Sequence, residues 1–99
     1  LDETNYSFLD YCLKNRRLTP NTIRVYRFDL QHFNKFLSRE PQMITDFNEV
    51  SKAILERYLS SLQNYSIKTI KRKFACVRSL FHYLEYEEKI NQNPFSRFE

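Results

Sequence analysis

The sequence contains no glycine among its 99 residues. Phosphate-binding loops and dinucleotide-binding fingerprints need glycine, because only glycine lets the backbone approach a phosphate closely, so both motifs are excluded. Hairpins built on tight glycine turns are disfavoured for a related reason. Without glycine, another residue must take the left-handed conformation that ends many helices, and we expect Asn15, Asn64 and Asn91 in this role.

Cysteine and long apolar runs are also scarce. Cys12 and Cys76 stand far apart, without the Cys-x-x-Cys spacing of zinc or thiol-redox sites. We interpret them as buried, reduced thiols of a cytoplasmic protein, and a single disulfide is the alternative. No apolar run approaches the roughly 18 residues of a membrane span, and the first residues do not form a signal peptide. The missing initiator Met suggests a fragment of a longer chain.

The residues that are present describe a basic globular domain. Hydrophobic residues make up 41% of the chain and aromatic residues 16%, which is enough to form one core. Sixteen basic and 12 acidic residues give a net charge of +4. This balance is compatible with a polyanionic partner, and an ordinary basic domain without such a partner is the alternative.

Apolar residues recur at three- and four-residue spacing in separate segments, which predicts amphipathic helices. Ser and Thr residues precede these segments as N-caps, and Pro20 takes the first position of the second helix. In the loop 41–50, Met43, Ile44 and Phe47 are expected to contact the core. We predict an all-α, compact bundle of four main helices. These helices run from about Thr4 to Arg16, from Pro20 to near Arg39, from Ser51 to Asn64, and from Ser66 through Leu84 to a stop at Pro94.

Basic residues gather on one side of the fourth predicted helix. At about 100° per residue, Lys73 falls beside the apolar stripe, where its ammonium is expected to snorkel to solvent. Positive charge near a helix start opposes the helix dipole, and an external polyanion would compensate for it. An ordinary solvated face is the alternative interpretation. The arc opposite the apolar stripe contains Lys68, Lys71, Arg72, Ala75, Arg78, Ser79 and His82.

The second helix repeats this pattern more weakly. Its polar side is interrupted by Asp29, and the two helices side by side would form a basic surface the size of a DNA groove. The polar residues opposite its apolar stripe are Asn21, Arg24, Arg27, Gln31 and Lys35.

No pattern of catalytic or metal-ligating residues is found in the sequence. His32 and His82 are isolated and lack ligand spacing. No nucleophile–base pattern and no spaced acidic cluster is suggested. We therefore expect no metal, no cofactor and no small-molecule substrate, and an enzyme complete within these residues is disfavoured.

Three stretches of the chain resemble one known family. LTPNTIRVYRFDLQHFNKFL is similar to the second-helix segment of the core-binding domain of tyrosine recombinases, the phage-integrase and Xer type. YSIKTIKRKFACVRSLFHYLEYEEKINQNPF is similar to the last long helix of that domain and its exit, and ITDFNEVSKAILERYLSSL fits the segment between. The exit turn departs from the family, because it has Lys89 where glycine is common. The resemblance is carried by Thr22, Tyr26, Leu30, Phe33, Leu37, Ser66, Thr69, Ile70, Leu80, Phe81, Tyr83, Leu84 and Asn93-Pro94.

The resemblance implies that residues 1–99 form one SAM-like core-binding domain. In this family that domain packs on one side of the duplex and a catalytic domain packs on the other. The second and fourth helices of the small domain face the DNA. The implied DNA-binding residues are Thr22, Arg24, Arg27, Ser66, Lys68, Thr69, Lys71 and Arg72, and the basic arc adds Arg78.

The catalytic residues of the family belong to its second domain, and none of the seven tyrosines here matches the nucleophile. The fragment is therefore expected not to be an enzyme, whereas its parent would cut and rejoin DNA through a phosphotyrosine link. The implied partners are double-stranded DNA and, at full length, other recombinase subunits, with no membrane. The alternative is a helical protein-protein interaction module whose basic face is solvated or binds an acidic partner.

Overall fold

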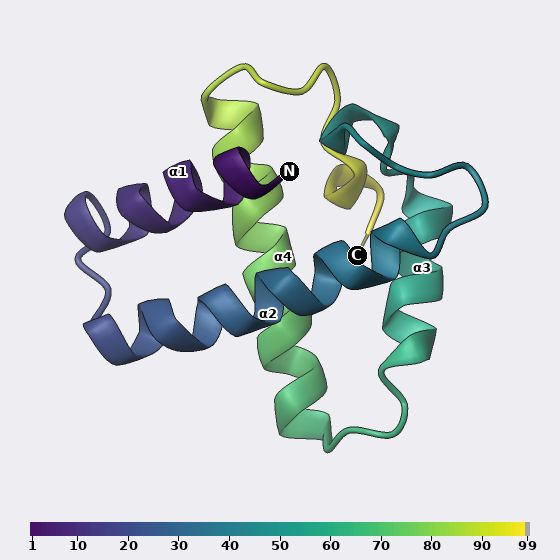
Figure 1. The fold of residues 1–99 in the computed structure, drawn as a ribbon, viewed down its shortest axis with the longest axis horizontal. Helices are drawn as coiled ribbons and strands as arrows, with labels where there is room; N and C mark the ends of the chain where they lie inside the picture. Colours follow the sequence, from purple (N-terminus) through teal and green to yellow (C-terminus); the bar gives the residue numbers. More distant parts are fainter. Residues whose placement is uncertain (99) are drawn as a thin grey trace.

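The computed structural model describes residues 1–98, which form four α-helices, two short 3-10 helices and no strand. The helices α1 and α2 form an antiparallel hairpin that lies across α4, and α3 runs alongside α4 near the C-terminal end of α2 (Figure 1). The predicted all-α bundle of four main helices is confirmed. The elements are α1 (Asp2–Lys14), α2 (Pro20–Ser38), η1 (Phe47–Glu49), α3 (Lys52–Ser61), α4 (Ile67–Tyr86) and η2 (Pro94–Arg97).

The starts of three helices are capped as predicted. The side-chain oxygens of Thr19, Ser51 and Ser66 each accept a hydrogen bond from the backbone N–H three residues later. Pro20 follows Thr19 at the start of α2, where its missing N–H costs no helical hydrogen bond. These caps satisfy donors that a helix start would otherwise leave unpaired, and each contributes about 1 kcal/mol.

The helix ends differ from the prediction. The left-handed residues among those described are Arg17, Met43 and Glu88, not asparagines, and Asn15 has a φ of −97°. At the end of α4 the N–H of Lys89 bonds the carbonyl of Leu84 at 2.8 Å, and the N–H of Glu88 bonds that of Glu85 at 3.1 Å. These bonds offset the roughly 1–2 kcal/mol that a left-handed conformation costs a residue with a side chain.

The helix bounds also differ at several ends. The helix α1 begins and ends two residues before the predicted bounds, α3 ends at Ser61 instead of near Asn64, and α4 ends at Tyr86. In the loop 41–50, Ile44 and Phe47 are buried as predicted, whereas Met43 is 73% exposed. The predicted contact of Met43 with the core is wrong.

The core is centred on aromatic side chains from α2, α3 and α4. The ring of Phe33 meets the rings of Tyr58 and Phe81 edge-on, with centroid distances of 4.9 and 6.4 Å. All three side chains are fully buried, and so are the free thiols Cys12 and Cys76. Burial raises the pKa of both thiols, so they pack as small apolar groups, as the sequence suggested.

In residues 1–98, no helix combines the length and the apolar character needed to cross a membrane.

Two phenylalanines of α2 provide a matched test of this core. Phe33 is fully buried, whereas Phe28 is 63% exposed on the opposite side of the same helix. We expect Phe33→Ala to lower the free energy of unfolding by about 3–5 kcal/mol, because it leaves a cavity among α2, α3 and α4. Phe28→Ala, the control, should change it by less than about 1 kcal/mol. Urea unfolding followed by circular dichroism measures both, and equal losses would contradict this core.

Candidate nucleic-acid interface

Most residues of the basic arc of α4 are exposed to solvent. Lys68, Lys71, Arg72 and Arg78 are exposed, and so is Ser66 at the N-cap, whereas Thr69 is half-buried. Helical spacing places Ala75, Ser79 and His82 on this same side of the helix. The first turn of α4 contains no acidic residue. Its exposed N–H groups and cations therefore present positive charge to solvent.

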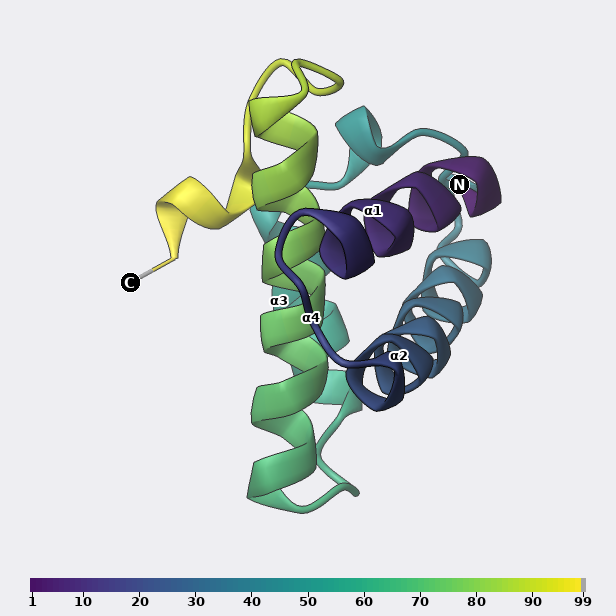
Figure 2. The same cartoon turned by 90° about the vertical axis from the view of Figure 1, so that its left-hand side faces the viewer.

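The helix α2 crosses α4 near Tyr26 and Asp29, and its N-terminal part continues past α4 to the α1–α2 connection (Figures 1 and 2). Thr22 is half-buried and bonds the cap Thr19 through its hydroxyl, at 2.9 Å. Arg24 is exposed, and its guanidinium donates to the side chain of Asn21. Arg27 departs from this group. It lines a hollow between α1 and α2 with Asp2, Asn5 and Tyr6 among its neighbours.

A buried carboxylate joins α2 to α4 at the edge of the surface. Asp29 is 1% exposed, and its two oxygens accept from Nε of Arg72 at 3.1 Å and from Nη2 of Arg72 at 3.0 Å. The ammonium of Lys73 donates to the same carboxylate at 3.1 Å. The ammonium also lies 5.3 Å from the ring centroid of Tyr65. A carboxylate this deeply buried is expected to be paired, and here two cations pair with it.

This arrangement corrects two expectations. Asp29 does not interrupt the polar side of α2, because it points into the contact between α2 and α4. Lys73 does not snorkel to solvent, because its side chain is only 8% exposed and ends at Asp29. Both residues were placed on the wrong side for one reason: periodicity within a single helix does not show which charges a second helix covers.

A histidine lies between two tyrosines next to this carboxylate. Nδ1 of His32 lies 3.1 Å from the hydroxyl of Tyr58, and Nε2 lies 3.4 Å from that of Tyr65. Burial lowers the pKa of His32, and the charge of Lys73 lowers it further. Burial also disfavours the charged form of Tyr58, and for a phenol this raises the pKa. Neutral imidazole and protonated phenol are therefore the stable forms here, which suits a structural role.

The basic surface extends toward the end of α1. A hollow of about 630 Å³ brings Arg16 together with Arg78, Ser79 and His82 of α4. The guanidinium of Arg78 lies over the rings of Phe74 and Phe95, 5.8 and 5.5 Å from their centroids. Arg16 was not among the predicted DNA-binding residues. The sequence offered only two adjacent arginines at the end of the first predicted helix, and the fold brings Arg16 beside α4.

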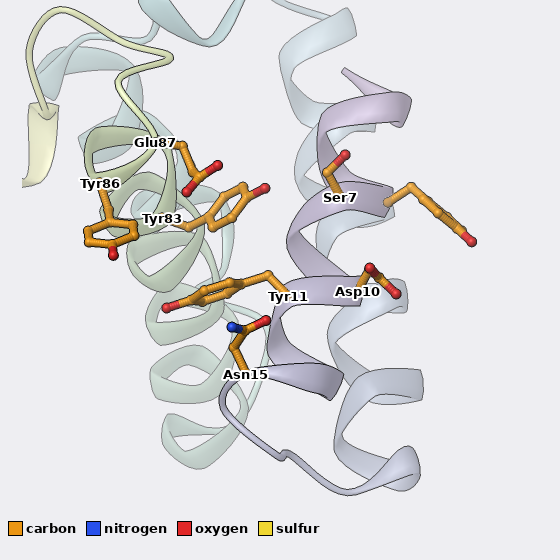
Figure 3. Close-up of a pocket in the computed structure, with 8 residues that line it drawn as sticks. Ser7, Asp10, Tyr11, Asn15, Tyr83, Tyr86 and Glu87 are labelled. Atoms are coloured by element: carbon orange, nitrogen blue, oxygen red, sulfur yellow. The ribbon is translucent and has the colours of Figure 1, made fainter.

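A second hollow lies between α1 and the end of α4 and has the opposite charge. It measures about 550 Å³ and contains the carboxylates of Asp10 and Glu87 beside Tyr11, Tyr83 and Tyr86 (Figure 3). Burial raises the pKa of Tyr83, so its phenol stays neutral. Negative charge makes this hollow a poor site for phosphate, and the candidate interface ends before it.

Among the described residues 1–98, no three His, Cys, Asp or Glu side chains lie close enough together to hold a metal ion.

Comparisons with known proteins point to one family. Residues 6–88 match the family described as "Phage integrase, N-terminal SAM-like domain". A tyrosine recombinase of Agathobacter rectalis is 38% identical over 94% of this chain and 29% of its own length. The tyrosine recombinases XerC of Halalkalibacterium halodurans and Listeria monocytogenes are 36% and 35% identical, over 95% and 90% of this chain. The chain spans 31% and 30% of their lengths. No solved structure matches the chain significantly.

The buried carboxylate gives a stability prediction. Asp29→Ala removes the carboxylate and leaves the ammonium of Lys73 buried without a partner. We therefore expect the free energy of unfolding to fall by about 3–5 kcal/mol. Asp10→Ala is the control, since its exposed pair with Lys14, at 3.2 Å, should be worth about 0–1 kcal/mol. Urea unfolding compares the two variants. A loss below about 1 kcal/mol for Asp29→Ala would contradict the pairing.

His32 gives a pH prediction. Its pKa in the folded chain lies below the ordinary value of 6.5, so below about that pH the unfolded chain binds more protons than the folded one. Its contribution to stability is therefore complete above about pH 6.5 and is lost as the pH falls toward the lower folded pKa. We expect the free energy of unfolding to fall less steeply between about pH 7 and 5 in His32→Gln than in wild type. Parallel pH profiles from urea unfolding would refute this.

Proposed function

Because the chain belongs to the phage-integrase N-terminal SAM-like family of tyrosine recombinases, we propose that it grips duplex DNA through α2 and α4. Most of the contacts in this proposal go to phosphates, with limited base readout. The observation that carries it is the exposed basic arc of α4, which begins at a capped helix start without acidic residues. Positive charge at that end of a helix is unfavourable unless an external anion is present.

The arrangement of the arc suits a DNA groove. Ala75 and Ser79 are small; Ala75 lies between the cations at the helix start and Arg78, and Ser79 lies between Arg78 and His82. A helix with small residues between basic ones can lie close to phosphate-lined walls, and the start of α4 offers backbone N–H groups to a phosphate. Arg16 extends this surface by one further cation. Arg27 stays in the proposal as a contact at its edge.

We extend the proposal to a longer protein that would contain this domain. Its relatives are about three times as long as the matched region, and we propose a full-length tyrosine recombinase that acts in the cytoplasm. A catalytic domain would close on the other side of the duplex and supply the nucleophilic tyrosine. The strand would be cut and rejoined through a phosphotyrosine link, without metal or cofactor, and subunits would pair on the DNA.

A second candidate function is that of a helical protein-protein interaction module. The acidic hollow favours it, because two of the tyrosines that line this hollow, Tyr6 and Tyr86, are 71% and 72% exposed. Exposed tyrosines are enriched in protein interfaces. This candidate predicts binding to a protein partner and no affinity for duplex DNA.

Salt dependence and charge reversal test the DNA proposal. If about four to six phosphates are neutralised, affinity for a short duplex should fall by ~10²–10³ between about 50 and 200 mM salt. Lys71→Glu should weaken binding to every duplex by a similar factor, because a phosphate contact carries no sequence information. Lys89→Glu is the matched control, with the same charge change beyond the other end of α4. Fluorescence anisotropy with a labelled duplex measures all three proteins.

Two outcomes would contradict the proposal. One is an affinity that does not change with salt. The other is an equal loss of affinity in Lys71→Glu and Lys89→Glu, which would mean that net charge alone is responsible. Absence of any binding at low salt would favour the protein-interaction module.

A further inference from the structure

The carboxylate of Asp29 is paired with two cations, Arg72 and Lys73, and only Lys73 is buried with it. The side chains of Asp29 and Lys73 are 1% and 8% exposed, and that of Arg72 is 45% exposed. Lys73 by itself supplies the charge that neutralises Asp29. Arg72 therefore adds a net positive charge at the surface, held in place by a carboxylate that does not need it for neutrality.

The geometry of Arg72 leaves a defined set of donors free. Nε and one N–H of Nη2 are used by Asp29, at 3.1 and 3.0 Å. Both N–H groups of Nη1 and the second one of Nη2 remain, and one N–H from each of these nitrogens forms a parallel pair at the end of the guanidinium that the carboxylate does not occupy. Such a pair of parallel donors can bond O6 and N7 of guanine in the major groove.

We propose that Arg72 reads a guanine in the major groove and that Asp29 is the positioning residue that aims it. The inference rests on the proposed DNA-binding function and assigns one base-specific contact within it. Arg72 is then a determinant of sequence specificity and does more than bind phosphate.

The difference between Arg72 and its basic neighbours supports this assignment. The structure records no side-chain hydrogen bond or ion pair for Lys68 or Lys71, within the residues it describes. A mobile ammonium suits phosphate, which requires charge but little direction, whereas base readout needs donors in a fixed direction. Asp29 supplies that direction, because two hydrogen bonds fix the guanidinium before DNA arrives.

The position on α4 fits the same role. Arg72 stands in the second turn of the helix, one turn after Lys68, and exposed Ala75 follows three residues later. A major groove of about 12 Å admits an α-helix, and recognition helices contact base edges with residues near their start. The small side chain of Ala75 leaves room for the helix to approach the base edges beside Arg72.

A selection experiment tests the inference without a known target site. Duplexes with a randomised centre are bound at low salt, and the bound fraction is sequenced. Wild type should enrich guanine at one position, by roughly 5- to 150-fold for a bidentate contact. Arg72→Lys keeps the charge and leaves Lys73 on Asp29, but it lacks the fork of donors, so this enrichment should disappear while binding persists. Arg57→Lys is the matched control, because Arg57 also pairs with a carboxylate, that of Glu40, but stands on α3 outside the basic surface, and it should retain the enrichment.

Chemical substitution in the DNA gives a second readout. Replacing the preferred guanine by 7-deazaguanine exchanges the N7 acceptor for a C–H group and leaves O6 and the Watson–Crick edge unchanged. Wild type should lose affinity for this duplex, whereas Arg72→Lys should bind both duplexes equally. Asp29→Asn removes one of the two carboxylate acceptors, and it should reduce the guanine preference while the dependence on salt stays the same.

The outcomes separate the inference from the function on which it rests. Binding without a guanine preference, or a preference that survives in Arg72→Lys, would overturn the role of Arg72 and leave the DNA grip standing. Absence of binding to any duplex would overturn both. Thermal unfolding would show whether Asp29→Asn folds. If it does not fold, Arg72→Lys and the 7-deazaguanine duplex still test whether Arg72 reads a guanine.

Discussion

The buried carboxylate of Asp29 is the interaction on which the surface of this chain depends. It joins the middle of α2 to the second turn of α4 through Arg72 and Lys73. A buried ion pair of this kind adds little net stability compared with apolar packing, but breaking it is costly because a charge is then left unpaired. The pairing therefore fixes how the two helices meet, and it fixes which cation of α4 remains at the surface.

The charges of the domain are separated into two regions as a consequence. Cations from the start of α4, the start of α2 and the end of α1 lie on one side, where Arg16 and Arg78 share a hollow. The acidic hollow with Asp10 and Glu87 lies on a neighbouring side, and Tyr11, Tyr83 and Tyr86 line both hollows. A duplex on the first side would leave the second free for other contacts. The net charge of the chain, +4, does not reveal this separation.

Much of the fold could be predicted from local patterns. Thr19 with Pro20, Ser51 and Ser66 begin helices because each cap is decided by a few neighbouring residues. The helix ends were less predictable. Glu88 takes the left-handed conformation because the carbonyls of Leu84 and Glu85 then accept hydrogen bonds from the N–H groups of Lys89 and Glu88. These bonds outweigh the general preference for asparagine in this conformation. Ile67 has the helical spacing of the apolar residues of α4 but is 73% exposed, whereas Tyr83 is buried against aromatic rings of α1. Spacing within α4 does not show where α1 will pack.

The sequence by itself determined the helical class, the capped starts of α2, α3 and α4, and the cations of the basic arc, because these follow from residues three and four positions apart. The tertiary structure alone decided how those charges are used. It placed Asp29 and Lys73 in the interior, moved Arg27 to the side of α1, and brought Arg16 to Arg78. Such pairings join residues far apart in the chain, and periodicity within one helix contains no information about which other helix will cover it.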